Sequence, residues 1–227
     1  MKEKMIELKN VCKTYKHGNQ KMVLKDLNLE VEKGEMVAIL GKSGSGKTTL
    51  LQILGLMKKK DSGEYRLDGK ILDKKRDSEL ARLRNEKIGS IFQDFKLIDT
   101  LSAKENISVP LFLRGYRENE CEESVEELAE QFEIEEVLET KVKELSGGEK
   151  QRVAIARAII GNPDVLLADE PTGALDSDTA QQIMDIFKRL QEQGKTILIV
   201  THDRKIAKQC NRILYLRDGI LEEHGEP

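Results

Sequence analysis

The stretch that decides the fold reads Gly41-Lys42-Ser43-Gly44-Ser45-Gly46-Lys47-Thr48, which matches the pattern G-x-x-x-x-G-K-[ST]. An apolar run, 36–40, precedes it, and the leucine-rich stretch 49–54 follows it. Strand, glycine-rich loop and helix is the context in which this pattern forms a phosphate-binding loop. The sequence therefore predicts an α/β fold built around such a loop. A chance glycine-rich turn is the alternative, and the matching context argues against it.

Each part of this loop has a chemical use. The glycines let backbone N–H groups curve around an anion with no Cβ in the way. The helix that starts near Lys47 directs the positive end of its dipole at the same anion. Lys47 supplies a charge for the β- and γ-phosphates, and the Thr48 hydroxyl suits Mg²⁺. We expect a nucleoside triphosphate to bind through Gly41, Ser43, Gly44, Ser45, Gly46, Lys47, Thr48 and Thr49.

The composition is that of a soluble globular protein. The 227 residues are 38% hydrophobic and 35% charged, which suits one large α/β domain or a core with a small subdomain. A net charge of −3 gives no electrostatic reason to expect nucleic acid. Three scattered cysteines without a C-x-x-C pair argue against zinc. No apolar run approaches the ~20 residues that cross a bilayer, so we expect another polypeptide to supply any membrane part.

Hydrophobic patterning predicts alternating strands and helices. The first third is strand-rich with a turn at 17–19, and the apolar runs of the last third suit buried parallel strands. The acidic stretch 120–139 has apolar residues near helical spacing, and its acidic face is either solvated or an interaction face. The expected strands are 5–8, 23–31, 65–70, 88–92, 165–168, 196–200, 213–216 and 220–221, and the expected helices are 78–85, 120–139, 148–160 and 179–193.

Two acidic residues and a histidine come directly after predicted parallel strands. A side chain at the carboxyl end of such a strand lies in the crevice where open α/β sheets bind ligands. Asp169 is suited to hold Mg²⁺ through water, and Glu170 is suited to polarise an attacking water. His202 follows the next strand of the sheet, and we expect it to contact the γ-phosphate.

A second anion site is indicated at Ser146, which precedes the predicted helix 148–160. Ser146 suits the N-cap, and Gly147 and Gly148 leave backbone N–H groups open at the helix start. The chain thus has two phosphate-binding sites and one set of hydrolytic groups. Two copies packed head to tail would resolve this, with each nucleotide between the Lys47 loop of one copy and the Ser146 helix of the other.

Together these motifs resemble those of the ATP-binding cassette (ABC) ATPases. The resemblance covers essentially the whole chain and adds Gln93, the signature 145–148 and the segment 173–176 to the motifs above. It implies a P-loop NTPase fold with a RecA-like core, an antiparallel β subdomain and an inserted helical subdomain. The whole of 1–227 would form a single ABC ATPase domain, with 1–92 and 162–227 as the nucleotide-binding core with its β subdomain and 93–161 as the helical subdomain.

The resemblance also implies further site residues and the cofactors ATP and Mg²⁺. It makes Gln93 a ligand near Mg²⁺ and the attacking water, and it places Tyr15 on the adenine ring. It places Asp176 in a loop that crosses the dimer interface, and it gives nucleotide contacts to Ser146, Gly147, Gly148 and Glu149. Glu149 stands where many members have Gln, and Ala174 where many have Asn or Ser; neither is a catalytic position in the family.

The segments 92–106 and 167–177 resemble one branch of the family. It contains the ATPases of macrolide-type exporters, lipoprotein-release systems and antimicrobial-peptide or haem efflux pumps. The resemblance implies a subunit of a bacterial transporter that is cytoplasmic and peripheral on the inner face of the cell membrane. This subunit would drive a separate permease, either for efflux of a peptide, antibiotic or other amphipathic substrate or for lipoprotein release. The docking groove would include Phe95, Leu97, Ile98, Leu111, Phe112 and Leu113, unless about half of these belong to the subdomain's own core.

Two alternatives stay open at this point. The cell-division ATPase FtsE is a close relative of the branch and suggests a nucleotide-gated regulator of a membrane partner without solute transport. A soluble ABC protein acting on DNA or ribosomes is the other. The stretch 93–145 is too short for the long coiled coil of DNA-repair members, and ribosome-acting members usually carry two cassettes, so we expect no nucleic acid partner.

Overall fold

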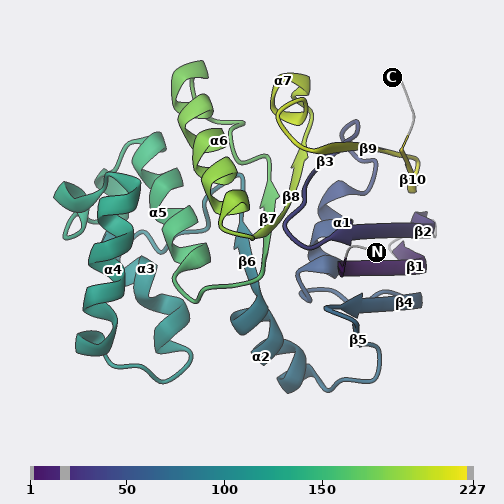
Figure 1. The fold of residues 1–227 in the computed structure, drawn as a ribbon, viewed down its shortest axis with the longest axis horizontal. Helices are drawn as coiled ribbons and strands as arrows, with labels where there is room; N and C mark the ends of the chain where they lie inside the picture. Colours follow the sequence, from purple (N-terminus) through teal and green to yellow (C-terminus); the bar gives the residue numbers. More distant parts are fainter. Residues whose placement is uncertain (1–2, 16–20, 224–227) are drawn as a thin grey trace.

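The computed structural model describes residues 3–15 and 21–223, and the turn expected at 17–19 lies outside them. Within these ranges the chain forms two sheets and a set of helices. Figure 1 shows the helices α3, α4 and α5 at one end of the molecule and the antiparallel strands β1, β2 and β4 at the other. A parallel sheet lies between these two parts, so the predicted α/β fold class is confirmed.

The central sheet has six strands in the order β10-β9-β3-β8-β7-β6, and all neighbours except β10 and β9 are parallel. Successive residues of β7 enter different cores, Leu166 facing the helical side and Leu167 the side of the antiparallel sheet. Because β3, β7 and β8 are buried on both faces, these three strands appear in sequence as continuous apolar runs. The strands are β3 (Met36–Leu40), β6 (Ile88–Ile91), β7 (Val165–Asp169), β8 (Thr196–Thr201), β9 (Arg212–Arg217) and β10 (Ile220–Glu222).

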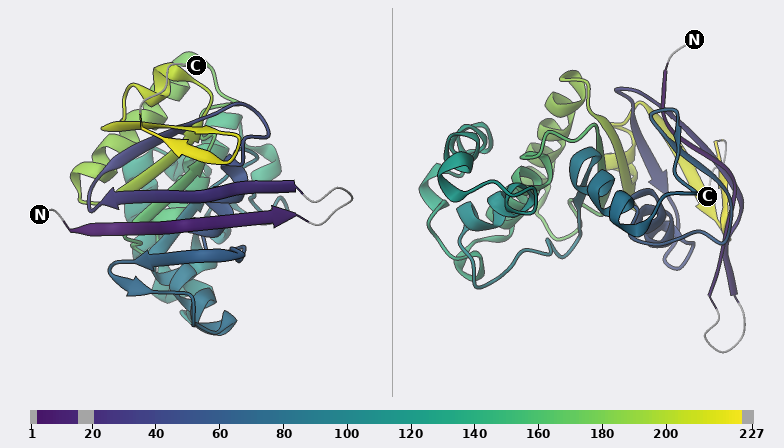
Figure 2. Two further views of the ribbon diagram at one scale, coloured as in Figure 1. Left: turned by 90° about the vertical axis from the view of Figure 1, so that its right-hand side faces the viewer. Right: turned by 90° about the horizontal axis from the view of Figure 1, so that it is seen from below.

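The smaller sheet is antiparallel, in the order β2-β1-β4-β5, and its strands lie across the central sheet (Figure 2). Its inner face shares a core with the helix that follows the phosphate loop, since Ile6, Leu27, Leu50 and Leu54 are all buried in one cluster. The elements of this part are β1 (Lys4–Tyr15), β2 (Lys21–Glu32), β4 (Ser62–Leu67), β5 (Lys70–Ile71), α1 (Lys47–Leu54) and α2 (Asp77–Lys87).

The helices α3 (Ala103–Phe112), α4 (Glu118–Phe132) and α5 (Gly147–Ile159) lie within the range 93–161, where the helical subdomain is expected. The short 3₁₀ turns Glu135–Val137 and Val142–Glu144 join α4 to α5. The core of these helices continues into α6 (Ser177–Glu192) and the central sheet, and α7 (Arg204–Ala207) follows β8. The division into subdomains at residues 93 and 161 stays a prediction.

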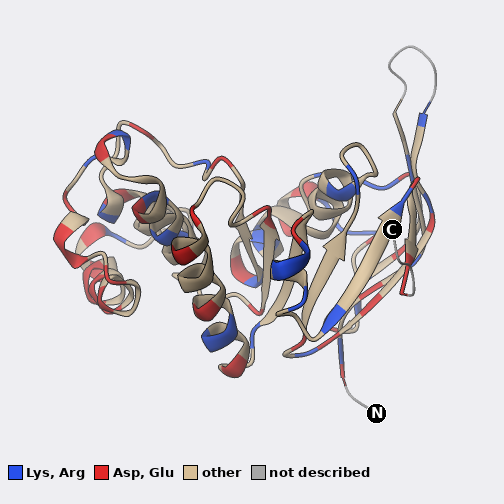
Figure 3. Cartoon of the chain, turned by 90° about the horizontal axis from the view of Figure 1, so that it is seen from above, with Lys and Arg blue, Asp and Glu red and all other residues tan. Residues whose placement is uncertain are grey.

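The helix expected over 120–139 is shorter than predicted. It ends at Phe132, because Glu133 adopts the left-handed conformation (φ 54°) that caps helices at their carboxyl end. Val137 nevertheless packs against the same core from a 3₁₀ turn, so the apolar spacing continues past the real end of the helix. Figure 3 shows acidic residues concentrated over α4. In the described part of the chain no helix is long and apolar enough to span a bilayer.

Candidate active site

The phosphate loop joins the central strand β3 to α1, and its glycines meet specific constraints. Gly44 and Gly46 have φ values of 78° and 110°, in the left-handed region that side chains rarely adopt. A Cβ on Gly41 would lie 2.6 Å from the carbonyl oxygen of Leu216. The ammonium of Lys47 folds back over the loop and donates to the carbonyl oxygens of Gly41 at 2.6 Å and Lys42 at 3.1 Å. A positive charge thus sits beside the N-terminus of α1.

A cleft of about 680 Å³ opens in front of this loop, within the size range of ligand pockets. It brings together residues from five separate parts of the sequence, and all of them except Val23 follow the carboxyl ends of parallel strands. The lining residues are Val23, Ser43, Gly44, Gly46, Lys47, Thr48, Thr49, Gln93, Asp169, Glu170 and His202. Most of the expected phosphate, metal and catalytic residues therefore share one cleft. Val23, from the antiparallel sheet, carries no sequence signal that would have predicted it.

Glu170 and His202 form a tightly held pair in this cleft. His202 Nδ1 lies 2.8 Å from Glu170 Oε1, while the Thr201 hydroxyl donates to Oε2 at 3.1 Å and the His202 amide at 3.4 Å. The Glu170 side chain is 12% exposed and that of His202 is 72% exposed, so the histidine shields the carboxylate from the open side. Glu170 has a φ of 47°, and its amide donates to Val200. Sequence reasoning missed Thr201, which fixes the carboxylate from within the sheet.

Asp169 lies at the end of β7, beside the start of α1. The Thr48 hydroxyl donates to its Oδ2 at 3.4 Å. Burial, followed by the charge of Glu170, raises the pKa of Asp169, and the opposing effects of Thr48 and Lys47 only reduce that rise. The Asp169 carboxylate thus lacks full neutralisation by protein groups. This is the electrostatic setting that favours a bound cation.

The loop after Gln93 is held by the helix α5. Phe95 and Lys96 have φ values of 58° and 50°, and their carbonyl oxygens accept from the Arg157 guanidinium at 2.8 Å and 2.6 Å. Burial lowers the pKa of Arg157, consistent with its position beneath the loop. The Gln93 amide lies near Gly173, in the turn that follows Glu170. Arg157 therefore links α5 to the loop of Gln93, a role that its place in a helical pattern did not reveal.

Ser146 caps α5 as expected. Its hydroxyl accepts from the Glu149 amide at 3.3 Å, and the Glu149 carboxylate accepts from the Ser146 amide at 2.7 Å. The Ser146 side chain, followed by the Ser146 amide, lowers the pKa of Glu149. A Cβ on Gly148 would lie 3.1 Å from a methyl of Thr179, so α5 starts against α6. The Ser146 end of α5 does not line the cleft that contains Lys47.

Asp176 caps α6 and likewise lies outside the cleft. Its carboxylate accepts from the amides of Asp178 and Thr179 at 3.0 Å and from the Thr179 hydroxyl at 2.7 Å. These hydrogen bonds lower the pKa of Asp176. The carboxylate is therefore ionised and fixed in direction, close to the start of α5.

Tyr15 lies one contact behind the cleft. Its hydroxyl is 3.2 Å from the Thr49 hydroxyl, and the Lys58 ammonium donates to it at 2.6 Å. Burial raises the pKa of Tyr15, but the hydrogen bonds that it makes with Lys58 and Thr49 outweigh that effect, so the pKa is lowered. Among the predicted groove residues, Leu111 is only 7% exposed and belongs to the helical core, which is the alternative stated for about half of these residues.

Comparison with known proteins decides the family. The sequence profile described as "ABC transporter" matches residues 24–173, well over half of the chain. The chain is an ATPase of the ABC transporter family. The ABC transporter ATP-binding protein MJ0796 of Methanocaldococcus jannaschii is 46% identical over 224 residues, covering 96% of this chain and 95% of that protein. YvrO of Bacillus subtilis, also named as an ABC transporter ATP-binding protein, is 43% identical, covering 98% of each chain.

The macrolide export ATP-binding/permease protein MacB of Campylobacter jejuni is 47% identical over 215 residues. The match covers 95% of this ABC ATPase but only 33% of MacB, so the chain spans about a third of that relative's length. MJ0796 has been solved as a dimer in a post-hydrolysis state bound to ADP and Pi. That structure matches this fold with a TM-score of 0.89 at 44% identity, covering 98% of this chain and 100% of that chain.

Proposed function

We propose that this ABC ATPase binds Mg-ATP in the cleft at Lys47 and hydrolyses it when a second copy closes head to tail over the nucleotide. One observation carries the proposal. The cleft holds the phosphate loop, Glu170 and His202, whereas the capped helix start at Ser146 opens elsewhere on the same chain. A second copy can bring its Ser146 helix to this cleft and complete the site. The dimeric structures of MJ0796 support this arrangement.

The groups in the cleft divide the chemistry among them. Backbone N–H groups of the loop and the Lys47 ammonium bind the β- and γ-phosphates. Thr48, Asp169 and Gln93 would hold Mg²⁺, which supplies charge neutralisation on the phosphates. Their oxygens fit it, because Mg²⁺ in such sites takes one or two carboxylates and leaves its other positions to phosphate and water.

Glu170 orients and deprotonates the attacking water, and His202 keeps its carboxylate in place and contacts the γ-phosphate. In the closed dimer the second copy adds the Ser146–Glu149 helix start, where the amides of Gly147 and Gly148, which lie outside the capping box, face the phosphates. Its Asp176 lies beside that helix start and crosses the interface. Tyr15 takes the adenine ring. Each of these roles gives the fixed geometry of the cleft a use in ATP hydrolysis.

The work of the dimer is transport by a separate membrane permease. The macrolide export relatives are named as ATP-binding/permease proteins, and this chain spans about a third of their length. We infer export of a peptide, antibiotic or other amphipathic substrate, or release of a lipoprotein, by a dimer that is peripheral on the inner face of the cell membrane. The exposed apolar side chains of Ile98, Phe112 and Leu113 are candidates for the docking surface, together with the partly buried Phe95 and Leu97.

The test is a pull-down with tagged Glu170→Gln protein and Mg-ATP from solubilised membranes of the native host. Loss of the base should arrest the closed dimer on its partner. A co-purifying permease, absent when Lys47→Ala is the bait, would support the proposal. A membrane partner without transport activity would favour regulation in the manner of FtsE, and recovery of only soluble partners would overturn the transporter assignment.

A further inference from the structure

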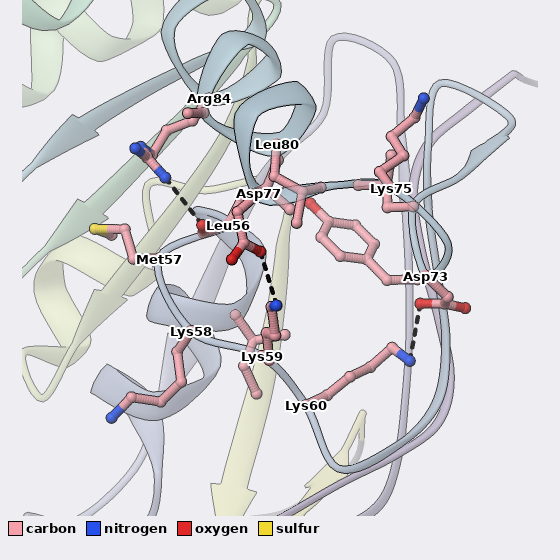
Figure 4. A pocket seen from close by; sticks show the side chains of 14 residues that line it. Leu56, Met57, Lys58, Lys59, Lys60, Asp73, Lys75, Asp77, Leu80 and Arg84 are labelled. Atoms are coloured by element: carbon pink, nitrogen blue, oxygen red, sulfur yellow. Dashed lines mark hydrogen bonds and ion pairs between the residues drawn. The ribbon is translucent and has the colours of Figure 1, made fainter.

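Three consecutive lysines follow α1 and point to three different partners. Lys59 pairs with Asp77 at 2.7 Å and Lys60 with Asp73 at 2.8 Å, both at the pocket between α1 and α2 (Figure 4). The ammonium of Lys58 points away from these two pairs in the same view. It donates to the Tyr15 hydroxyl at 2.6 Å. Lys58 is therefore the one member of this triplet that reaches toward the nucleotide side of α1.

The backbone holds Lys58 at its place. Leu56 adopts a left-handed φ of 56°, which turns the chain back over the last turn of α1. The amides of Met57 and Lys58 then both donate to the carbonyl oxygen of Gln52, at 2.8 Å and 3.0 Å. Two hydrogen bonds to one acceptor fix the start of the Lys58 side chain against the helix. Its contact with Tyr15 thus arises from an ordered turn.

Tyr15 connects Lys58 to the cleft. An ammonium has donors only, so the Tyr15 oxygen must accept from Lys58. The hydroxyl oxygens of Tyr15 and Thr49 lie 3.2 Å apart, a distance at which either group can donate. The contact with Lys58 polarises the phenol and favours its O–H as the donor. Thr49 is only 9% exposed and lines the cleft. When its oxygen accepts from Tyr15, its own proton is left to donate to an anion in the cleft.

We propose that Lys58, Tyr15 and Thr49 form a polarised hydrogen-bond chain that presents the Thr49 hydroxyl to a nucleotide phosphate, with Lys58 as a positioning residue. The inference rests on the proposed function, because it requires phosphates in this cleft. It gives Tyr15 a second task besides contact with the base. The phenolic oxygen of Tyr15 should then contribute to the affinity for the phosphates of any nucleoside triphosphate, whereas its ring should contribute only through contact with the base.

The experiment measures dissociation constants of the full chain for ATP, GTP and adenosine by calorimetry. Tyr15→Phe keeps the ring and removes the hydroxyl, and Lys58→Met removes the donor. We expect each change to weaken ATP and GTP alike by about three- to tenfold, with little change for adenosine. The double variant should be no weaker than about the worse single variant, because both break the same chain. Lys58→Arg should restore most of the affinity.

Lys59→Met is the matched control, since it removes a neighbouring lysine whose partner Asp77 lies outside the cleft. Lys59→Met should leave all three dissociation constants unchanged. In steady-state ATPase assays, Lys58→Met should raise KM more than it lowers kcat. Unchanged ATP affinity in Tyr15→Phe, or a loss confined to adenine nucleotides, would overturn the hydrogen-bond chain. Undiminished ATP binding by Lys47→Ala would instead refute the proposed nucleotide site itself.

Discussion

Thr201 offers a test of how the catalytic carboxylate is held. Its buried hydroxyl donates to Glu170 Oε2 at 3.1 Å and accepts from the Asp203 amide at 3.0 Å. Thr201→Val keeps the shape of the side chain and removes both hydrogen bonds. A bond to a charged group contributes about 1.5–3 kcal/mol and a neutral one about 1 kcal/mol, so the expected loss of folding stability is about 2.5–4 kcal/mol. Because Glu170 would lose its fixed direction, we expect kcat to fall about 10- to 100-fold.

The chain contains a matched control on the same strand. Thr196 is equally buried at the other end of β8, and its hydroxyl accepts from the Gly34 amide at 3.0 Å, far from the cleft. Thr196→Val should cost about 1 kcal/mol and leave turnover unchanged. Stability is measured by urea unfolding and turnover by phosphate release at saturating Mg-ATP. If both variants had the same kcat as the unchanged protein, Thr201 would not position the carboxylate, and the reasoning would fail.

Three further changes test other parts of the site. Asp169→Asn should stabilise the protein without nucleotide at neutral pH, because the pKa of Asp169 is higher in the folded than in the unfolded chain and its ionisation therefore costs folding stability. The gain should vanish below the ordinary aspartate pKa, where Asp169 is protonated in both states. Urea unfolding midpoints measured across pH test this, and a destabilised Asp169→Asn protein at neutral pH would contradict it. Gly46→Ala should abolish ATP binding and lower the folding stability by about 1–3 kcal/mol, since the φ of Gly46 is 110° and the new Cβ would lie 3.0 Å from the Val23 carbonyl oxygen. ATP binding at normal affinity would contradict this prediction. Phe95→Asp should remove permease co-purification while basal ATPase activity persists, and unchanged co-purification would exclude Phe95 from the docking surface.

The central sheet could be predicted from the sequence because both of its faces are buried. Residues 165–168 and 196–200 are continuous apolar runs, and the amphipathic crossover helix between them has one clearly apolar face. No helix is expected from the sequence over Ala103–Phe112, because Pro110 interrupts the pattern. The capping pair Ser102 and Glu105 was the available signal for that helix.

The site likewise contains residues that can be predicted from the sequence and residues that cannot. Residues at strand ends, such as Asp169 and His202, could be predicted because parallel topology places strand ends at one edge of the sheet. Thr201 and Arg157 could not, because each acts through a contact between segments that only the folded chain brings together. The predicted helix runs past the real end of α4 for a similar reason, since a left-handed cap on a non-glycine residue such as Glu133 gives no signal in the sequence.

The most direct test of the central claim is the mass of the Glu170→Gln protein in solution, measured by sedimentation equilibrium with Mg-ATP and with ADP. Two copies closing on ATP should give twice the 25.7 kDa chain mass in ATP and the single mass in ADP. Adding Ser146→Arg should return the ATP sample to the single mass. A Glu170→Gln protein that binds ATP yet stays at 25.7 kDa would contradict the composite, head-to-tail site.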